Sequence, residues 1–192
     1  MKSLNQYINE KLKLSKKQYQ YFPKTREELD DLLDQLLKER GWEADLNDIN
    51  VYNITDMSGL FAKHRNSIYK FKYNKNYNFS EFNGDISGWN VSNVTDMRGM
   101  FCGCEKFESK GLENWDVSNV TDMRWMFQRC ENFEGKELEN WDVLNVTRMN
   151  GMFLSCKKLN CNLSKWDVSN VEYYDNIFLK CPLKDEYKPK FR

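Results

Sequence analysis

The chain has no net charge, no long apolar run and almost no histidine, and these absences exclude several classes of function. Lys+Arg and Asp+Glu both number 29 in 192 residues, so no global charge selects nucleic acid, a membrane surface or acidic substrates. No stretch approaches the ~20 apolar residues of a membrane span. The first residues lack the continuous apolar region of a signal peptide. We therefore expect a protein that is cytoplasmic or carried within a particle, and not secreted.

Residues typical of catalytic and metal sites are also scarce. The single histidine, His64, has no evident Ser or Cys partner in the sequence, and we find no phosphate-binding glycine loop. Cys102 and Cys104 lack a second ligand pair at metal-binding spacing. We predict no metal, no cofactor and no enzymatic activity.

What the chain does have is one phrase repeated along its second half. Copies of Trp-Asp-Val-Ser-Asn-Val-Thr-Asp-Met begin at Trp89, Trp115, Trp141 and Trp166, which are 26, 26 and 25 residues apart. A weaker first copy has Ile49 at the tryptophan position. A fixed period in this range is typical of a solenoid, in which each unit buries its apolar side against its neighbours. The phrase predicts about five coils over residues 46–183.

The apolar spacing inside one unit predicts how each coil is built. Residues 112–120 match L-x-x-W-x-V-x-x-V, the spacing of a leucine-rich repeat, with a short strand at 115–117. Val120, Met123, Phe127 and Cys130 follow at helical intervals, so the return leg is expected to be helical. The fold class we predict is an α/β repeat solenoid, with short parallel strands on one face and helices or turns on the other.

The cysteines share one repeat position, because Cys104, Cys130, Cys156 and Cys181 each lie three residues after a repeat phenylalanine. Adjacent coils bring such residues within disulfide distance. Parallel, inward-pointing side chains and the missing export signal favour buried free thiols.

Two segments precede the repeats. Residues 1–22 form a basic amphipathic arm, either a helix that packs on the next segment or a docking and targeting peptide. Residues 23–45 combine a capping box, Thr25 with Glu28, an apolar leucine stripe and a stop at Gly41. They predict a helical N-terminal cap that covers the exposed end of the array. Residues 184–192 form a C-terminal tail.

The first repeat is 40 residues long, which implies an insertion of 14 residues within 62–81. Its aromatic and basic residues alternate with the period of a strand, and the candidate contacts are Tyr69, Lys70, Phe71, Lys72 and Tyr73. Three roles remain open for this insertion: covering an edge of the array, docking a partner protein, or binding single-stranded nucleic acid through phosphate neutralisation and base stacking.

Over residues 46–183 the chain resembles the BspA-like leucine-rich-repeat family, whose units read roughly W-D-V-S-N-V-T-D-M-x-x-M-F-x-x-C-x-x-F. The resemblance implies a right-handed parallel solenoid, and many relatives are bacterial surface proteins engaged in adhesion or recognition. This chain lacks the signal peptide and the lipid-attachment cysteine of that group. Its short, lysine-rich start ahead of one small array is more similar to phage-encoded members.

The candidate binding residues fall into two sets. The residue after the repeat tryptophan forms a ladder of Asn90, Asp116, Asp142 and Asp167, which either presents an acidic stripe to a partner or fixes the local turns. Departures from the phrase are the second set: Trp125 replaces a glycine, and Leu144 replaces a serine. We predict a non-enzymatic module that recognises a protein partner through its strand face and these departures. The alternatives are a component of a phage particle addressed by the N-terminal arm, and nucleic-acid binding through the insertion.

Overall fold

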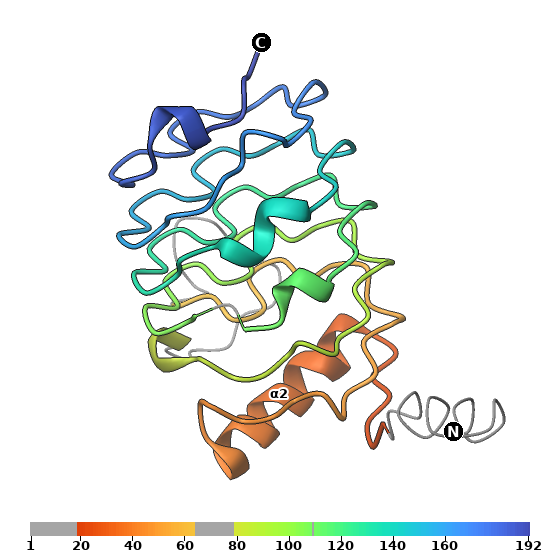
Figure 1. Ribbon diagram of the computed structural model, residues 1–192. Helices are drawn as coiled ribbons and strands as arrows, with labels where there is room; N and C mark the ends of the chain where they lie inside the picture. The colour runs from red at the N-terminus through yellow and green to blue at the C-terminus, as the bar shows by residue number, and fades with distance from the viewer. Residues whose placement is uncertain (1–18, 64–78, 109) are drawn as a thin grey trace, which may run out of the picture.

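The repeats stack one on another, with a helix at one end of the stack and the C-terminus at the other (Figure 1). The computed structural model describes residues 19–63, 79–108 and 110–192. Helix α2 (Arg26–Arg40) precedes four short 3-10 helices, which are η1 (Phe79–Glu81), η2 (Leu112–Asn114), η3 (Lys136–Asn140) and η4 (Asp185–Tyr187). No helix in the described part of the chain has the length and apolar character needed to cross a membrane.

The expected α/β solenoid, a right-handed leucine-rich-repeat-like array with parallel strands on one face, is wrong. Within the described residues the repeats form no sheet, and neighbouring repeats are joined only by isolated parallel bridges. One series of bridges runs from Asp56 through Asp96, Asp122 and Arg148 to Tyr173. The repeats are therefore stacked turns, and the backbone contacts between equivalent turns take the place of strand ladders.

Two local features explain why turns replace the expected strand and helix. Asp116 Oδ1 accepts the N–H of Ser118 at 3.1 Å, a local bond that bends the backbone just after the repeat tryptophan. The return leg from Val120 to Cys130 contains Trp125 and Arg129 with φ angles of 57° and 59°. A right-handed helix cannot continue through a left-handed residue, so this leg proceeds as a series of tight turns.

The core is a column of stacked aromatic rings, one from each repeat. Phe61, Phe101, Phe127, Phe153 and Phe178 follow one another with centroid separations of 5.6, 5.6, 5.8 and 5.7 Å. Such aromatic pairs contribute about 0.5–1.5 kcal/mol each beyond the burial of their surface. The fixed period of the sequence thus becomes a continuous core in which each ring contacts the rings above and below.

Buried side-chain donors fasten each repeat to the one before it. The indole N–H groups of Trp89, Trp115, Trp141 and Trp166 donate to backbone carbonyls of the preceding repeat at 2.9, 3.3, 2.9 and 2.9 Å. Exposed amides do the same, as Asn119 Nδ2 donates to the carbonyl of Ser92 at 2.8 Å. The repeat tryptophans thus bury apolar surface and also donate hydrogen bonds to backbone carbonyls that have no partner in a sheet.

Helix α2 covers the N-terminal end of the stack and lies where the sequence predicts it. Thr25 Oγ1 accepts the N–H of Glu28 at 3.2 Å, and Gly41 ends the helix with a φ of 84°. The leucines of its apolar stripe are almost entirely buried, namely Leu29, Leu33, Leu36 and Leu37. Burial of one such side chain contributes roughly 1.5–3 kcal/mol, so the apolar stripe fixes this helix to the first repeat.

Candidate functional site

The predicted Asn/Asp ladder is exposed, and each of its side chains takes part in a turn of its own repeat. The Oδ1 atoms of Asn90, Asp116, Asp142 and Asp167 accept the backbone N–H two residues later at 3.1, 3.1, 3.1 and 3.0 Å. The Ser118 hydroxyl also donates to Asp116 at 2.6 Å, and these bonds hold the pKa of Asp116 below its usual value. The ladder therefore shapes the turns, while its role in partner binding stays a prediction.

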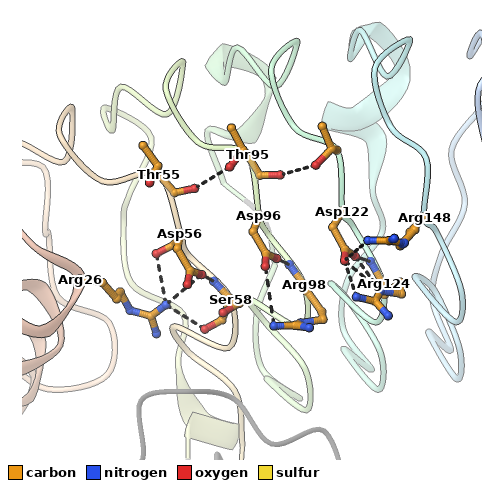
Figure 2. Close-up of polar contacts among 11 residues, drawn as sticks. Arg26, Thr55, Asp56, Ser58, Thr95, Asp96, Arg98, Asp122, Arg124 and Arg148 are labelled. Carbon is orange, nitrogen blue, oxygen red and sulfur yellow. Dashed lines mark hydrogen bonds and ion pairs between the residues drawn. The ribbon is translucent and has the colours of Figure 1, made fainter.

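A second column of charged side chains, which sequence analysis missed, runs through the Thr-Asp-Met part of the phrase (Figure 2). Asp56, Asp96 and Asp122 each accept the backbone N–H two residues later, at 2.8, 2.9 and 3.1 Å. Burial raises the pKa of Asp96, and the neighbouring carboxylates Asp56 and Asp122 add to this, although Arg98 opposes it. The next two repeats have Arg148 and Tyr173 at this position, a change of residue that could have been read from the sequence.

Arginines neutralise this column. Arg124 Nε lies 2.9 Å from both carboxylate oxygens of Asp122, and Arg148 Nη1 lies 4.0 Å from the same carboxylate (Figure 2). A fourth stacked carboxylate would have repelled Asp122, so Arg148 ends a run of like charges. The Arg148 guanidinium also lies over the Tyr173 ring, 5.9 Å from its centroid.

A groove with a volume of about 680 Å³ opens beside the last part of this column. Its lining includes Trp125, Arg148, Gly151, Tyr173 and Asp175. A Cβ atom on Gly151 would lie 2.6 Å from Trp125 Cδ1, so the indole lies directly over this glycine. The Arg124 guanidinium is 5.5 Å from the Trp125 ring centroid. The groove thus has two aromatic side chains in its lining, each in contact with an arginine.

Of the predicted contact residues that the structure describes, one lies in this groove. Trp125 is part of the lining, whereas Leu144, which is 41% exposed, and the four ladder residues are not. The candidate contacts of the insertion, Tyr69, Lys70, Phe71, Lys72 and Tyr73, lie outside the described residues. The structure adds Arg148, Tyr173 and Asp175 to the candidate contact residues. Together with Trp125 they come from three successive repeats and line one groove.

The cysteines are free, and most of them are buried. Cys104, Cys130 and Cys156 donate to the carbonyls of Phe61, Phe101 and Phe127 at 2.9, 3.0 and 2.9 Å. Burial raises the pKa of Cys130 and Cys156 well above the usual thiol value. In residues 19–63, 79–108 and 110–192, no cluster of three or more His, Cys, Asp and Glu side chains is placed to hold a metal ion. The described cysteines are therefore structural groups of the core.

Comparison with known proteins gives one family. No curated protein and no solved structure matches the sequence significantly. The family model described as "Mycoplasma protein of unknown function, DUF285" matches residues 30–110 and, in a second overlapping match, residues 70–188. Together the two matches span residues 30–188, which include most of α2 and all five repeats. The chain therefore belongs to the DUF285 family, which is related to the BspA-like repeat proteins.

Proposed function

We propose that this chain is a non-enzymatic protein-interaction module that binds a protein partner in the groove between Trp125 and Tyr173. One observation carries the proposal: residues that break the repeat phrase converge on this groove. Trp125 stands where three other repeats have Gly59, Gly99 and Gly151. Arg148 and Tyr173 stand where the first three repeats have aspartate. Stacking does not require these changes, because the other repeats stack without them.

The conformation of Trp125 supports a role beyond folding. Its φ of 57° lies in the left-handed region, which Gly99 and Gly151 adopt with φ of 60°. A bulky side chain in this region is strained, by about 1–2 kcal/mol. The indole is only partly buried, so packing recovers less of this cost than it would in the core. Binding to a partner is a physical reason to keep a tryptophan in a glycine position.

The chemistry of the groove also fits a protein surface. Trp, Tyr and Arg are the residues enriched among interface hot spots. The Arg148 side chain stays 50% exposed even though it contacts Asp122 and Tyr173, so a partner can reach its guanidinium. Tyr173 is also 50% exposed. Together these side chains offer aromatic area and a fixed positive charge at one end of the groove.

The proposal can be tested by restoring the repeat residues. Trp125→Gly and Tyr173→Asp, separately and together, return the groove to the sequence of the other repeats and should leave the thermal unfolding temperature nearly unchanged. Proteins captured from the native host by the wild-type chain are identified by mass spectrometry, and we expect the double variant to lose the specific ones. Leu144→Ser is the matched control, since it restores a repeat residue outside the groove. Retention of every specific partner by a folded double variant would refute the proposal.

Packaging in a phage particle, the second hypothesis from the sequence, depends on the N-terminal arm, of which residues 1–18 lie outside the described part of the chain. Deletion of residues 1–20 tests it, because loss of an address segment should lower the amount of protein in purified particles. Nucleic-acid binding depends on the insertion and predicts a steep dependence of affinity on salt.

A further inference from the structure

In each of the first four repeats, a row of backbone N–H groups along one edge donates hydrogen bonds to carbonyls of the next repeat. In the fourth repeat the N–H groups of alternate residues donate to carbonyls of the fifth at 2.7, 2.9, 3.0 and 2.9 Å, the pairs being Met149 to Tyr173, Gly151 to Asp175, Phe153 to Ile177 and Ser155 to Leu179. The third repeat donates to the fourth at the equivalent positions, from Met123, Trp125, Phe127 and Arg129. These bonds are the main backbone connection between repeats on this side of the stack.

The fifth repeat carries the same row of donors. The equivalent N–H groups belong to Tyr174, Asn176, Phe178 and Lys180, and no carbonyl of the described residues accepts them. Asn176 and Lys180 have φ angles of 58° and 57°, the same conformation as Gly151 and Ser155 one repeat earlier. The backbone of the fifth repeat therefore already has the conformation that presents these four N–H groups. We call residues 172–180 the open edge.

The opposite end of the stack is closed. Asp56 and Ser58 occupy the positions whose carbonyls accept from a preceding repeat elsewhere, and here the buried Arg26 Nη1 donates to both, at 3.3 and 2.8 Å (Figure 2). A second copy stacked head to tail would have to displace this arginine. Two open edges would face each other mainly with donors, so they do not complement one another either. A second copy of the chain is thus a poor occupant of the open edge.

The C-terminal tail does not occupy the donor row. The carbonyl of Tyr187 accepts the N–H of Leu163 at 2.9 Å, and Phe191 stacks on Tyr174 with centroids 4.4 Å apart. Lys188 Nζ also lies 5.7 Å from the centroid of the Phe178 ring, so the tail contacts side chains of this row while accepting none of its four N–H groups. Leu179 remains 49% exposed beside the donors. The edge therefore combines backbone donors with exposed apolar surface, the two requirements for adding an extended segment.

We propose that the open edge binds an extended segment of a partner protein, which runs parallel to residues 172–180 and accepts the N–H groups of Tyr174, Asn176, Phe178 and Lys180 with its carbonyls. This inference rests on the proposed binding function and names the class of partner. The charge of the edge adds a sequence requirement. Asp175 is exposed, and its carboxylate accepts a hydrogen bond from Asn150 Nδ2 of the fourth repeat at 3.3 Å. In the proposed complex, the added segment lies on the other side of Asp175 from Asn150. A basic side chain at that point of the partner pairs with Asp175.

The inference also connects the edge with the groove. Tyr173, Asp175 and Asn176 line the groove and belong to the open edge, so the groove ends where the added segment lies. A partner segment on the edge closes this end of the groove, and the rest of the partner reaches Trp125.

The test is backbone amide exchange measured by NMR, on the full chain. Without a partner, the four edge amides should exchange more than about tenfold faster than those of Gly151 and Phe153, at low and at high protein concentration. Protection at both concentrations would show that the chain covers its own edge, and protection only at high concentration would show a second copy. Either result overturns the inference.

A synthetic peptide serves as the probe for the bound state. It copies residues 145–155, whose carbonyls accept the same donors from the third repeat, with Asn150→Arg to face Asp175. We expect it to protect the four edge amides, and a version with Asn150→Glu to bind about fivefold more weakly. Asp175→Lys in the protein should reverse this preference. No protection, or a preference that the charge exchange does not reverse, would refute the proposal.

A matched pair of protein variants tests the backbone bonds. Asn176→Gly keeps the N–H and restores the residue of other repeats, so it should bind the peptide normally, whereas Asn176→Pro should bind about fivefold more weakly because one donor is lost. If the proline disturbs the loop, the peptide preference of Asp175→Lys still tests where the segment binds. Trp125→Gly should not change peptide binding, so failure at the edge and failure of the groove are seen separately.

Discussion

Replacement of Arg26 by alanine is the perturbation that most directly tests how the stack is closed. The Arg26 and Asp30 side chains are 4% and 3% exposed, and Arg26 Nε lies 3.0 Å from Asp30 Oδ2. The same guanidinium is 3.8 Å from Asp56 Oδ1 and donates to the carbonyls of Asp56 and Ser58. Arg26→Ala therefore removes two ion pairs and two hydrogen bonds to backbone carbonyls.

The expected loss is large for one side chain. Breaking a buried ion pair by removing one partner costs about 3–5 kcal/mol, because a carboxylate is left in an apolar site. Each lost bond to a carbonyl adds about 1 kcal/mol, in part already counted in the first figure. We expect the free energy of unfolding to fall by about 4 kcal/mol. For a chain of this size the unfolding temperature then falls by roughly 10 °C.

Thermal and urea unfolding, followed by circular dichroism, measure this loss. Arg40→Ala is the matched control, because Arg40 pairs with Asp48 at 3.0 Å on the surface of the same helix and should cost less than about 1 kcal/mol. Arg26→Ala/Asp30→Ala removes the buried Asp30 carboxylate together with Arg26, so part of the loss should be recovered. Equal effects of Arg26→Ala and Arg40→Ala would refute the view that Arg26 closes the N-terminal end.

Three further predictions concern the core and its charges. Phe127→Ala should lower the free energy of unfolding by about 3–5 kcal/mol in urea titrations, since it removes a ring from the centre of the aromatic column, and a loss below 1 kcal/mol would contradict this. Asp96 has a pKa raised above 3.8 in the folded state, so its ionisation destabilises the fold as pH rises through that folded pKa. Asp96→Asn should therefore have a higher free energy of unfolding than the wild type at pH 7. The difference should disappear as pH falls below about 4. Burial raises the pKa of Cys102 to about 12 and raises that of Cys130 well above the usual thiol value. Iodoacetamide at pH 8 should therefore leave both thiols unmodified in the folded protein and alkylate them in urea, as mass spectrometry will show.

The sequence predicted the parts of the fold that depend on local chemistry and on the period. The capping box at Thr25 and Glu28 located the beginning of α2, and the leucine stripe gave its buried face. The repeat period placed Phe101, Phe127 and Phe153 at one repeat position, where the structure stacks their rings. In each case the residue types alone determine the result, since caps are local and equivalent apolar side chains must meet when repeats stack.

The strand and the helical leg were predicted wrongly, because apolar spacing does not report backbone dihedral angles. Val120, Met123 and Phe127 have helical spacing, yet Trp125 lies between them in a left-handed conformation. The corresponding residues Gly99 and Gly151 are the sequence feature that indicates a left-handed backbone at this position. At the candidate site, Trp125 was found as a departure from the phrase. Arg148 and Tyr173 were missed because the position they share was taken as part of the constant phrase.

The hydrogen bonds that repeat side chains donate to backbone carbonyls of another repeat run in one direction, which bears on how the chain is made. The indole of Trp115, the thiol of Cys130 and the amide of Asn119 all belong to one repeat, and each donates to a carbonyl of the repeat before it. During synthesis the carbonyls that accept these side-chain bonds are therefore exposed before the side chains that donate to them. For this set of bonds the stack can assemble in the order of translation, because each new repeat finds its acceptors already synthesised.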